Sequence, residues 1–262
     1  MQIEDYIFGK NSVLEALKNG KRTINKIILQ KGLHTDSKTD EIIKLAKQNN
    51  ILFQFVPKEK FTQFKEYSYQ GVVAYCAPIK YKDLHEFIEY APQNAKVIVL
   101  DGVEDPHNVG SIIRTAVCAG FDAVILPQRR SAAINSTVEK SSAGAINHID
   151  LIIVNSLSGA IETLKKNNYW VIATEAKGKD NYYEVDYTNS NIVIVMGSEK
   201  TGISKTVLKQ ADFTVKIPMF ANFDSLNVAN AASIVIYPAA ESASGISPKN
   251  KNPSNAANII CE

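Results

Sequence analysis

Residues 96–126 read KVIVLDGVEDPHNVGSIIRTAVCAGFDAVIL and carry the clearest indication of secondary structure in the chain. An apolar run at 96–100 is followed by a polar loop, by apolar residues at helical spacing over 109–119, and by a second apolar run at 123–126. Short apolar runs that alternate with helices are typical of strands buried on both faces of a parallel sheet. The stretch therefore predicts a strand-helix-strand unit of an α/β domain.

The same alternation continues toward the C-terminus and predicts a doubly wound α/β domain over residues 95–241. Further strands are expected at 151–154, 170–174, 192–196 and 213–217. Further helices are expected at 136–142, 157–166, 205–210 and 227–237.

The segment before this domain predicts a smaller α/β unit over residues 1–77. It contains helix patterns at 11–19 and 36–50 and strand patterns at 26–30, 51–56 and 70–76. Residues 78–94 form a linker with one short helix, because Pro78 and Pro92 flank a helical spacing of apolar residues. Residues 242–262 are rich in Ser, Asn, Pro and Lys, lack apolar periodicity and are expected to be a disordered tail.

Charge and cysteine content narrow the class of protein. The chain has 29 Lys and Arg against 27 Asp and Glu, so no global positive field indicates a nucleic-acid partner, although basic residues are in excess within the first 65 positions. Three widely spaced cysteines fit neither a disulfide framework nor a metal site. We therefore expect no bound metal. No apolar run is long enough to span a bilayer, so we also expect a cytoplasmic protein with no membrane partner.

Three loops that follow predicted strands concentrate polar and glycine residues, which is where open parallel sheets bind their ligands. The first, DGVEDPHNVGSIIRTA, spans residues 101–116 and includes Asn108 and Arg114. The second, VMGSEKTGIS, spans residues 195–204 and is centred on Glu199. The third, IPMFANFDSLNVANAAS, spans residues 217–233. The lack of a GxGxxG motif after the first strand argues against the common Rossmann arrangement.

Together the three loops resemble the motifs of the SPOUT superfamily, specifically its SpoU or TrmH branch of RNA 2′-O-methyltransferases. The match resembles most closely the bacterial 23S ribosomal RNA guanosine 2′-O-methyltransferase subgroup, RlmB, on the residues DPHN, RRSAAIN and SSAGA within 105–145. Residues 5–77 resemble the small substrate-binding domain of that family. The loop at 220–224 departs from the family, which often has a glycine there.

The resemblance implies a parallel sheet with a C-terminal trefoil knot, S-adenosyl-L-methionine as cofactor, and a homodimer that contacts RNA rather than DNA. It places Arg114, Asn108, Glu199, Ser225 and Asn227 in the catalytic site. Arg114 would act either as the base or as an electrostatic stabiliser of the ribose oxygen, and the second role is easier to defend because a guanidinium is a very weak base. Backbone groups of Gly197, Ile217 and Leu226 would bind the cofactor.

Two other interpretations remain open at this point. The chain could methylate transfer RNA instead of ribosomal RNA, although the short transfer-RNA enzymes replace the substrate-binding domain by helical extensions. It could also be a non-catalytic RNA-binding assembly factor that kept the fold and lost the chemistry.

Overall fold

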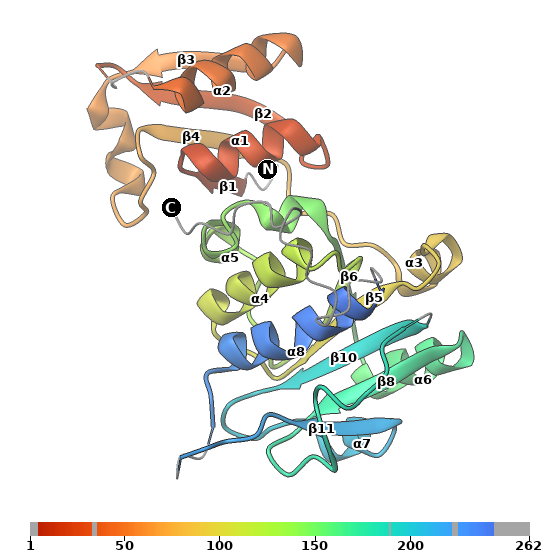
Figure 1. Cartoon of the computed structure of the whole chain (residues 1–262). Coiled ribbons are helices and arrows are strands. Elements are labelled where there is room, and N and C mark those ends of the chain that lie inside the picture. The colour runs from red at the N-terminus through yellow and green to blue at the C-terminus, as the bar shows by residue number, and fades with distance from the viewer. Residues whose placement is uncertain (1–4, 33–35, 189, 222–224, 244–262) are drawn as a thin grey trace, which may run out of the picture.

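The computed structural model describes residues 5–32, 36–188, 190–221 and 225–243, and these form two α/β units that follow one another along the chain (Figure 1). The N-terminal unit ends with strand β4. A linker that contains helix α3 (Leu84–Tyr90) leads to the larger C-terminal unit, which begins with strand β5. None of the described helices is long and apolar enough to cross a membrane.

The N-terminal unit is a four-stranded mixed sheet of order β1-β4-β2-β3. Strand β4 pairs antiparallel with β1 and β2, whereas β2 and β3 run parallel. Its elements are β1 (Asp5–Phe8), α1 (Lys10–Asn19), β2 (Ile24–Gln30), α2 (Ser37–Gln48), β3 (Leu52–Val56), the 3-10 helix η1 (Lys58–Phe64) and β4 (Val72–Cys76).

Each face of this small sheet has its own apolar cluster. Helices α1 and α2 cover one face, where Ile27, Ile42 and Val72 are fully buried. The other face packs against η1 through an aromatic cluster in which Phe8 and Phe64 contact each other. Covering both faces with separate clusters lets a unit of fewer than 80 residues bury enough apolar surface to hold its shape.

The C-terminal unit is a seven-stranded sheet of order β7-β6-β5-β10-β8-β11-β9 in which every pair is parallel. The strands are β5 (Lys96–Asp101), β6 (Ala123–Pro127), β7 (Asp150–Val154), β8 (Tyr169–Thr174), β9 (Asp180–Asn181), β10 (Asn191–Gly197) and β11 (Phe213–Lys216). The helices are α4 (Pro106–Cys118), α5 (Ser136–Ser141), the 3-10 helix η2 (Ala145–His148), α6 (Leu157–Lys166), α7 (Lys205–Leu208) and α8 (Val228–Ala243).

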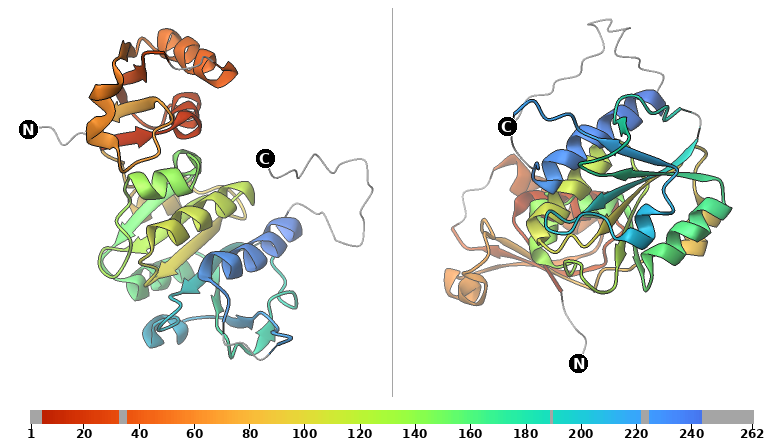
Figure 2. Two further views of the ribbon diagram at one scale, coloured as in Figure 1. Left: turned by 90° about the vertical axis from the view of Figure 1, so that its left-hand side faces the viewer. Right: turned by 90° about the horizontal axis from the view of Figure 1, so that it is seen from below.

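Helices cover both faces of this sheet (Figure 2). One apolar cluster joins the sheet to α4 and α8, and the other joins it to α3, α6 and α7. Side chains of β5 alternate between the clusters, with Ile98 in the first and Val99 in the second. The uninterrupted apolar strands of the sequence are thereby explained, because both of their faces are buried.

The predicted α/β fold is confirmed, with some elements that the sequence pattern did not predict. Strands β1 and β9 and the 3-10 helices η1 and η2 were not expected, and α8 extends six residues beyond the predicted end at residue 237. The last two residues of α8 fall within the 242–262 segment that was expected to lack structure, and the rest of that segment lies outside the described residues. The trefoil knot stays a prediction.

The two units are joined by a buried ionic contact. The Arg22 guanidinium from the N-terminal unit pairs with Asp5 and reaches Glu139 of α5, with 3.3 Å between Nη1 and Oε2. The Asn147 amide donates to the other Glu139 oxygen over 2.8 Å. Burial raises the pKa of Glu139, and the charge of Arg22 opposes that rise. The ion pair therefore offsets part of the cost of burying a carboxylate between the units.

A close backbone approach adds to this junction. Gly144, between α5 and η2, has φ of +87°, and a Cβ there would lie 2.8 Å from Cβ of Glu15 in α1. The same Glu15 carboxylate contacts His148 Nε2 at 3.0 Å. Only glycine lets the two units approach this closely at a positive φ.

Candidate functional site

The three loops singled out in the sequence leave the sheet at the carboxyl ends of β5, β10 and β11. Strands β5 and β10 are neighbours, and Asp101 at the end of β5 pairs with Gly197 at the end of β10. Strand β11 is separated from β10 only by β8. Parallel strands bring their carboxyl ends to one edge, so the three loops share one end of the sheet.

The loop after β5 turns directly into α4. The Asp105 carboxylate accepts a hydrogen bond from His107 N at 2.8 Å, and Pro106 takes the first helical position, where a missing N–H costs nothing. Asn108 therefore lies in the first turn of α4 and is half-buried, while Arg114 lies farther along the helix and is exposed.

The loop after β10 is a tight turn stabilised by its own polar groups. Gly202 N donates to Ser198 O at 2.9 Å, and Ser204 N donates to the Asp101 carboxylate at 2.8 Å. A Cβ on Gly197 would lie 2.4 Å from the Gly202 carbonyl carbon and from Ile203 N. Glycine at 197 is therefore required for the turn to close back onto the end of β10.

The third loop ends at Asn227, which caps α8. Its Oδ1 accepts from Ala229 N at 2.9 Å, so the side chain satisfies a free N–H of the first helical turn. Ser225 and Leu226 precede it and are exposed and half-buried, respectively. Ile217 follows the end of β11 and is half-buried.

A hydrogen-bond network centred on Asn227 joins the three loops. Its Nδ2 donates to Asn108 Oδ1 at 3.0 Å and to Glu199 Oε1 at 2.8 Å. The same Glu199 oxygen accepts from Val228 N at 3.1 Å. The carboxylate thus lies at the N-terminus of α8, where the helix dipole favours negative charge. The structure thus places Asn227 in contact with both Asn108 and Glu199, and the catalytic role of the three residues stays a prediction.

Arg114 stands apart from this network. Glu199 contacts Asn227 and Val228 instead of Arg114, and Arg114 forms no ion pair within the described ranges. The physical reason is that the N-terminus of α8 offers Glu199 two donors. The guanidinium is exposed and available to an incoming ligand.

Sequence reasoning did not identify three supporting contacts. Thr115 Oγ1 and Ser233 Oγ lie 3.2 Å apart and connect α4 to α8 at positions C-terminal to Asn108 and Asn227. Asp101 holds the turn after β10, and Thr174 at the end of β8 donates to Val195 O at 2.8 Å. Asp101 and Thr174 could have been identified from their positions at strand ends. Nothing in the sequence indicated a contact between Thr115 and Ser233.

No cluster of three or more metal-binding side chains occurs in the part of the chain that the structure describes. The site therefore consists of main-chain groups at the strand ends, the Asn108-Asn227-Glu199 network and one exposed guanidinium.

Comparison with known proteins gives the class of this fold and site. Residues 95–237 match the model of the SpoU rRNA methylase family, and residues 6–82 match the model for RNA 2′-O ribose methyltransferase substrate binding. The chain belongs to the SpoU rRNA methylase family and is an RNA methyltransferase of the SpoU/TrmH type.

Individual relatives agree with this family. A protein of Staphylococcus saprophyticus named a TrmH family tRNA/rRNA methyltransferase is 44% identical over 89% of this chain and 94% of its own length. An rRNA methyltransferase structure from Sinorhizobium meliloti has a TM-score of 0.76 at 25% identity and covers 91% of this chain and 87% of its own. A structure that concerns the 2-OH methylation of C/U34 on tRNA has a TM-score of 0.53 at 27% identity, and the match covers 58% of this chain and 98% of that one.

Proposed function

We propose that this protein transfers a methyl group from S-adenosyl-L-methionine to a ribose 2′-hydroxyl of RNA, and that its target is a guanosine of 23S ribosomal RNA. The observation that carries the proposal is the contact of Asn227 with both Asn108 and Glu199, which joins the three loops at the strand ends. The network adds direct contacts between the loops to the packing of α4 and the pairing of β5 and β10 that already position them.

Backbone groups of Gly197, Ile217 and Leu226 would hold the cofactor, which supplies an electrophilic methyl group when bound. The local geometry fits this role, because Gly197 has no side chain where the turn closes and leaves its main chain half-exposed at the end of β10. Family members have been crystallised with AdoMet, among them the rRNA methyltransferase from Sinorhizobium meliloti.

The chemistry then requires the ribose hydroxyl to be oriented and its developing negative charge to be stabilised. Arg114 is suited to the second task, since its guanidinium is permanently charged, exposed and free of a competing carboxylate in the described ranges. Asn108 and Asn227 fix the helix starts and orient the ribose, and Ser225 can donate to the substrate. Orientation alone contributes strongly, because effective molarities of well-placed groups reach about 10⁵ M or more.

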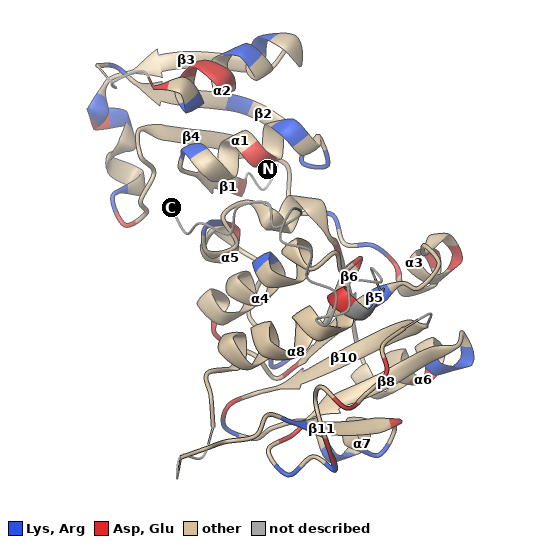
Figure 3. Cartoon of the chain, viewed as in Figure 1, with Lys and Arg blue, Asp and Glu red and all other residues tan. Residues whose placement is uncertain are grey.

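The extent of the structural similarity favours ribosomal RNA over transfer RNA. The match to the rRNA methyltransferase covers both units of this chain, whereas the tRNA-related structure covers 58% of it. We infer that residues 1–77 bind the RNA substrate, that residues 78–94 are a linker and that residues 95–241 carry the methyltransferase chemistry. Lys and Arg residues spread over the N-terminal unit support phosphate contacts there (Figure 3).

We also infer a cytoplasmic homodimer. Helices α4 and α8 lie side by side, and their sequences carry Arg114 and Glu241 as their charged residues (Figure 3). Tyr237 of α8 is 44% exposed, and small residues such as Ala231 allow close packing by a second copy. Light scattering of the full chain should give twice the monomer mass, and a monomer at micromolar concentration would remove this inference.

The decisive experiment is a methyl-transfer assay with radiolabelled S-adenosylmethionine on ribosomal and transfer RNA isolated from cells that lack the gene. We expect label in 23S ribosomal RNA and its mapping to a guanosine ribose. Label in transfer RNA alone would support the other enzymatic interpretation. Absence of transfer together with absence of cofactor binding in calorimetry would support the non-catalytic assembly factor.

A further inference from the structure

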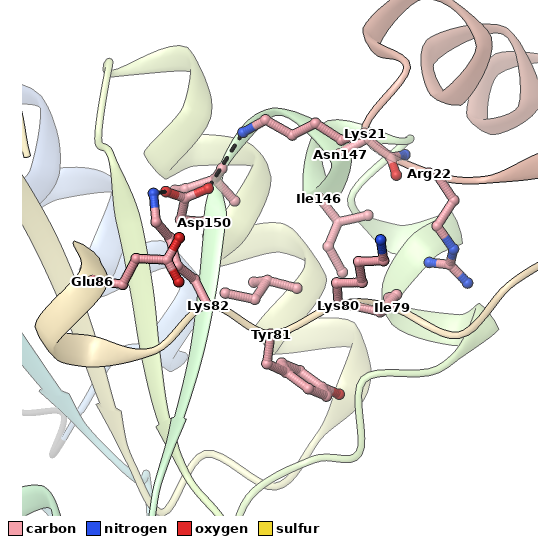
Figure 4. A pocket seen from close by; sticks show the side chains of 12 residues that line it. Lys21, Arg22, Ile79, Lys80, Tyr81, Lys82, Glu86, Ile146, Asn147 and Asp150 are labelled. Atoms are coloured by element: carbon pink, nitrogen blue, oxygen red, sulfur yellow. Dashed lines mark hydrogen bonds and ion pairs between the residues drawn. The ribbon is translucent and has the colours of Figure 1, made fainter. Parts of the chain in front are cut away.

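A cavity of about 370 Å³ lies between the N-terminal unit, the linker and the C-terminal unit (Figure 4). Its walls include apolar side chains of the linker, of η2 and of β7, namely Ile79, Ile146 and Leu151. Lys21, Lys80 and Lys82 also line it. The volume falls within the range of about 300–1,000 Å³ that small-molecule sites occupy.

The linker wall of the cavity is fixed at both ends. Arg22 Nε donates to Ala77 O at 3.0 Å, and Ala77 N donates to Thr23 O at 2.9 Å. At the other end, Lys82 N donates to Leu151 O at 2.8 Å. Residues 78–81 therefore span the gap between two anchored points, and the cavity is a preformed feature of the junction rather than a product of loose packing.

The charge around the cavity is unbalanced toward positive. Lys21 and Lys82 share one carboxylate, that of Asp150, at 3.4 and 2.9 Å. Lys80 is exposed and has no ion pair in the ranges that the structure describes, and Glu86 is the remaining acid of the lining. The Lys21 contact is long and its side chain is 53% exposed, so its ammonium group is available to another anion.

An aromatic ring completes the lining. Tyr81 lies next to Lys80 on the anchored linker and is 47% exposed. Apolar walls, an exposed aromatic ring and several ammonium groups together match the chemistry of one nucleotide, which has a flat base and a charged phosphate. The linker residues involved also fall inside the 6–82 segment that matches the substrate-binding model.

We propose that this cavity binds one nucleotide of single-stranded RNA, with the base against Tyr81 and the apolar wall and the phosphate at Lys80 and Lys21. The inference rests on the proposed RNA substrate and adds a second contact to it. The cavity is at the amino end of β7, whereas the methyltransferase loops leave the carboxyl ends of the strands. The site therefore anchors RNA at a distance from the reacting ribose and contributes to binding rather than to the chemical step.

The test uses full-length protein and a fluorescein-labelled, mixed-sequence single-stranded RNA of ten nucleotides, followed by anisotropy over a range of salt concentrations. Lys80→Ala should weaken binding severalfold and lower the slope of log affinity against log salt by about 0.7, the value for one phosphate on a single strand. Tyr81→Ala should weaken binding by at least about fivefold and leave the slope unchanged, while Tyr81→Phe should retain affinity. Lys209→Ala, an exposed lysine in the C-terminal unit, is the matched control and should change neither quantity.

Two further measurements separate the alternatives. Calorimetry with adenosine and guanosine 5′-monophosphate should show no submillimolar binding, and tight binding of either would make the cavity a free-nucleotide site and overturn the proposal. In methyl-transfer assays, Lys80→Ala should raise KM for RNA without changing kcat. Unchanged affinity and slope in Lys80→Ala and Tyr81→Ala would overturn this inference alone, whereas failure of the wild type to methylate RNA would overturn the proposed function itself.

Discussion

The Asn227 amide donates to the Glu199 carboxylate over 2.8 Å, and the same oxygen of Glu199 receives Val228 N of α8. One carboxylate thereby caps a helix and holds two loops that are 28 residues apart in the sequence. Because Asn227 also contacts Asn108, movement of any one loop would disturb the other two. These side-chain contacts add to the strand pairing that reaches Asp101 and Gly197 at this end of the sheet.

Removing the carboxylate should loosen this site. Glu199→Ala deprives Asn227 Nδ2 and Val228 N of their shared acceptor, and we expect a loss of about 1–2 kcal/mol in the free energy of unfolding together with weaker S-adenosylmethionine binding. Glu199→Gln keeps an acceptor oxygen and should retain most of both. Urea unfolding and cofactor calorimetry on the two variants measure the effects, and Lys200→Ala serves as an exposed neighbouring control. Undiminished cofactor affinity in Glu199→Ala would show that the network does not shape the cofactor loops.

Gly197 should not tolerate any side chain. A Cβ there would come within 2.4 Å of the backbone of Gly202 and Ile203, so Gly197→Ala must displace the turn after β10. We expect a lower melting temperature and at least tenfold weaker cofactor binding, which corresponds to about 1.4 kcal/mol. Gly159→Ala in α6 is the matched control, because its added Cβ would meet Ser156 at an ordinary distance of 3.6 Å. Equal behaviour of the two variants in thermal unfolding and calorimetry would argue against the close approach at Gly197.

Much of the fold was predictable because parallel strands buried on both faces appear as continuous apolar runs. Strands β5, β6, β7 and β10 follow this rule. Strands β8 and β11 follow it less well, because Trp170 of β8 is exposed and β11 includes Thr214 and Lys216, but all six strands were expected near their observed positions. Strand β1 was not expected, because DYIF is short and forms a strand only through its pairing with β4, about 70 residues later. The two-residue β9 depends in the same way on β11.

The candidate site was likewise predictable only in part. Its loops were predictable from their place after strands and from the family resemblance, and the structure brings Asn108, Glu199 and Asn227 together. The pairing of Glu199 was not predictable, because it depends on where the first N–H groups of α8 point. The buried contact of Arg22 with Glu139 was equally hidden, since 117 residues separate the two and neither has a local pattern that indicates the other.

The contact between the two units should contribute strongly to stability. Arg22→Ala leaves the buried Glu139 carboxylate without its cation, and breaking such a pair costs about 3–5 kcal/mol. Urea unfolding should therefore show a much lower midpoint for Arg22→Ala. In the double variant Arg22→Met, Glu139→Leu, apolar groups replace the pair, and part of the lost stability should return, because no carboxylate is left unpaired at 139 although Asn147 loses an acceptor. If the single variant unfolds at the wild-type midpoint, Arg22 does not join the units energetically.

Asp36 predicts a pH-dependent contribution at the start of α2. Its carboxylate accepts a hydrogen bond from Lys10 and one from Thr39 N, and these hold the pKa of Asp36 well below its ordinary value of 3.8. A lowered carboxyl pKa contributes stability that is present above the unfolded value and lost as pH falls through the folded one. Asp36→Ala should thus melt at a lower temperature than wild type at neutral pH, with the gap closing below pH 3.8. Asp40→Ala, an exposed acid in the same helical turn, is the control, and a gap independent of pH would refute the ionic origin.

Arg114 gives the most direct test of the proposed chemistry. Arg114→Ala should reduce single-turnover methyl transfer by about 10²–10³, the usual loss for one preorganised electrostatic group, and leave cofactor affinity within a few-fold. The side chain is exposed and forms no ion pair in the described ranges, so thermal unfolding should not change. Arg114→Lys keeps the charge and loses the planar fork, and substantial rescue would favour simple charge stabilisation over a role that needs the guanidinium geometry. A parallel fall of stability, cofactor binding and rate would instead assign Arg114 to bracing the loops, and full activity of Arg114→Ala would remove it from the site.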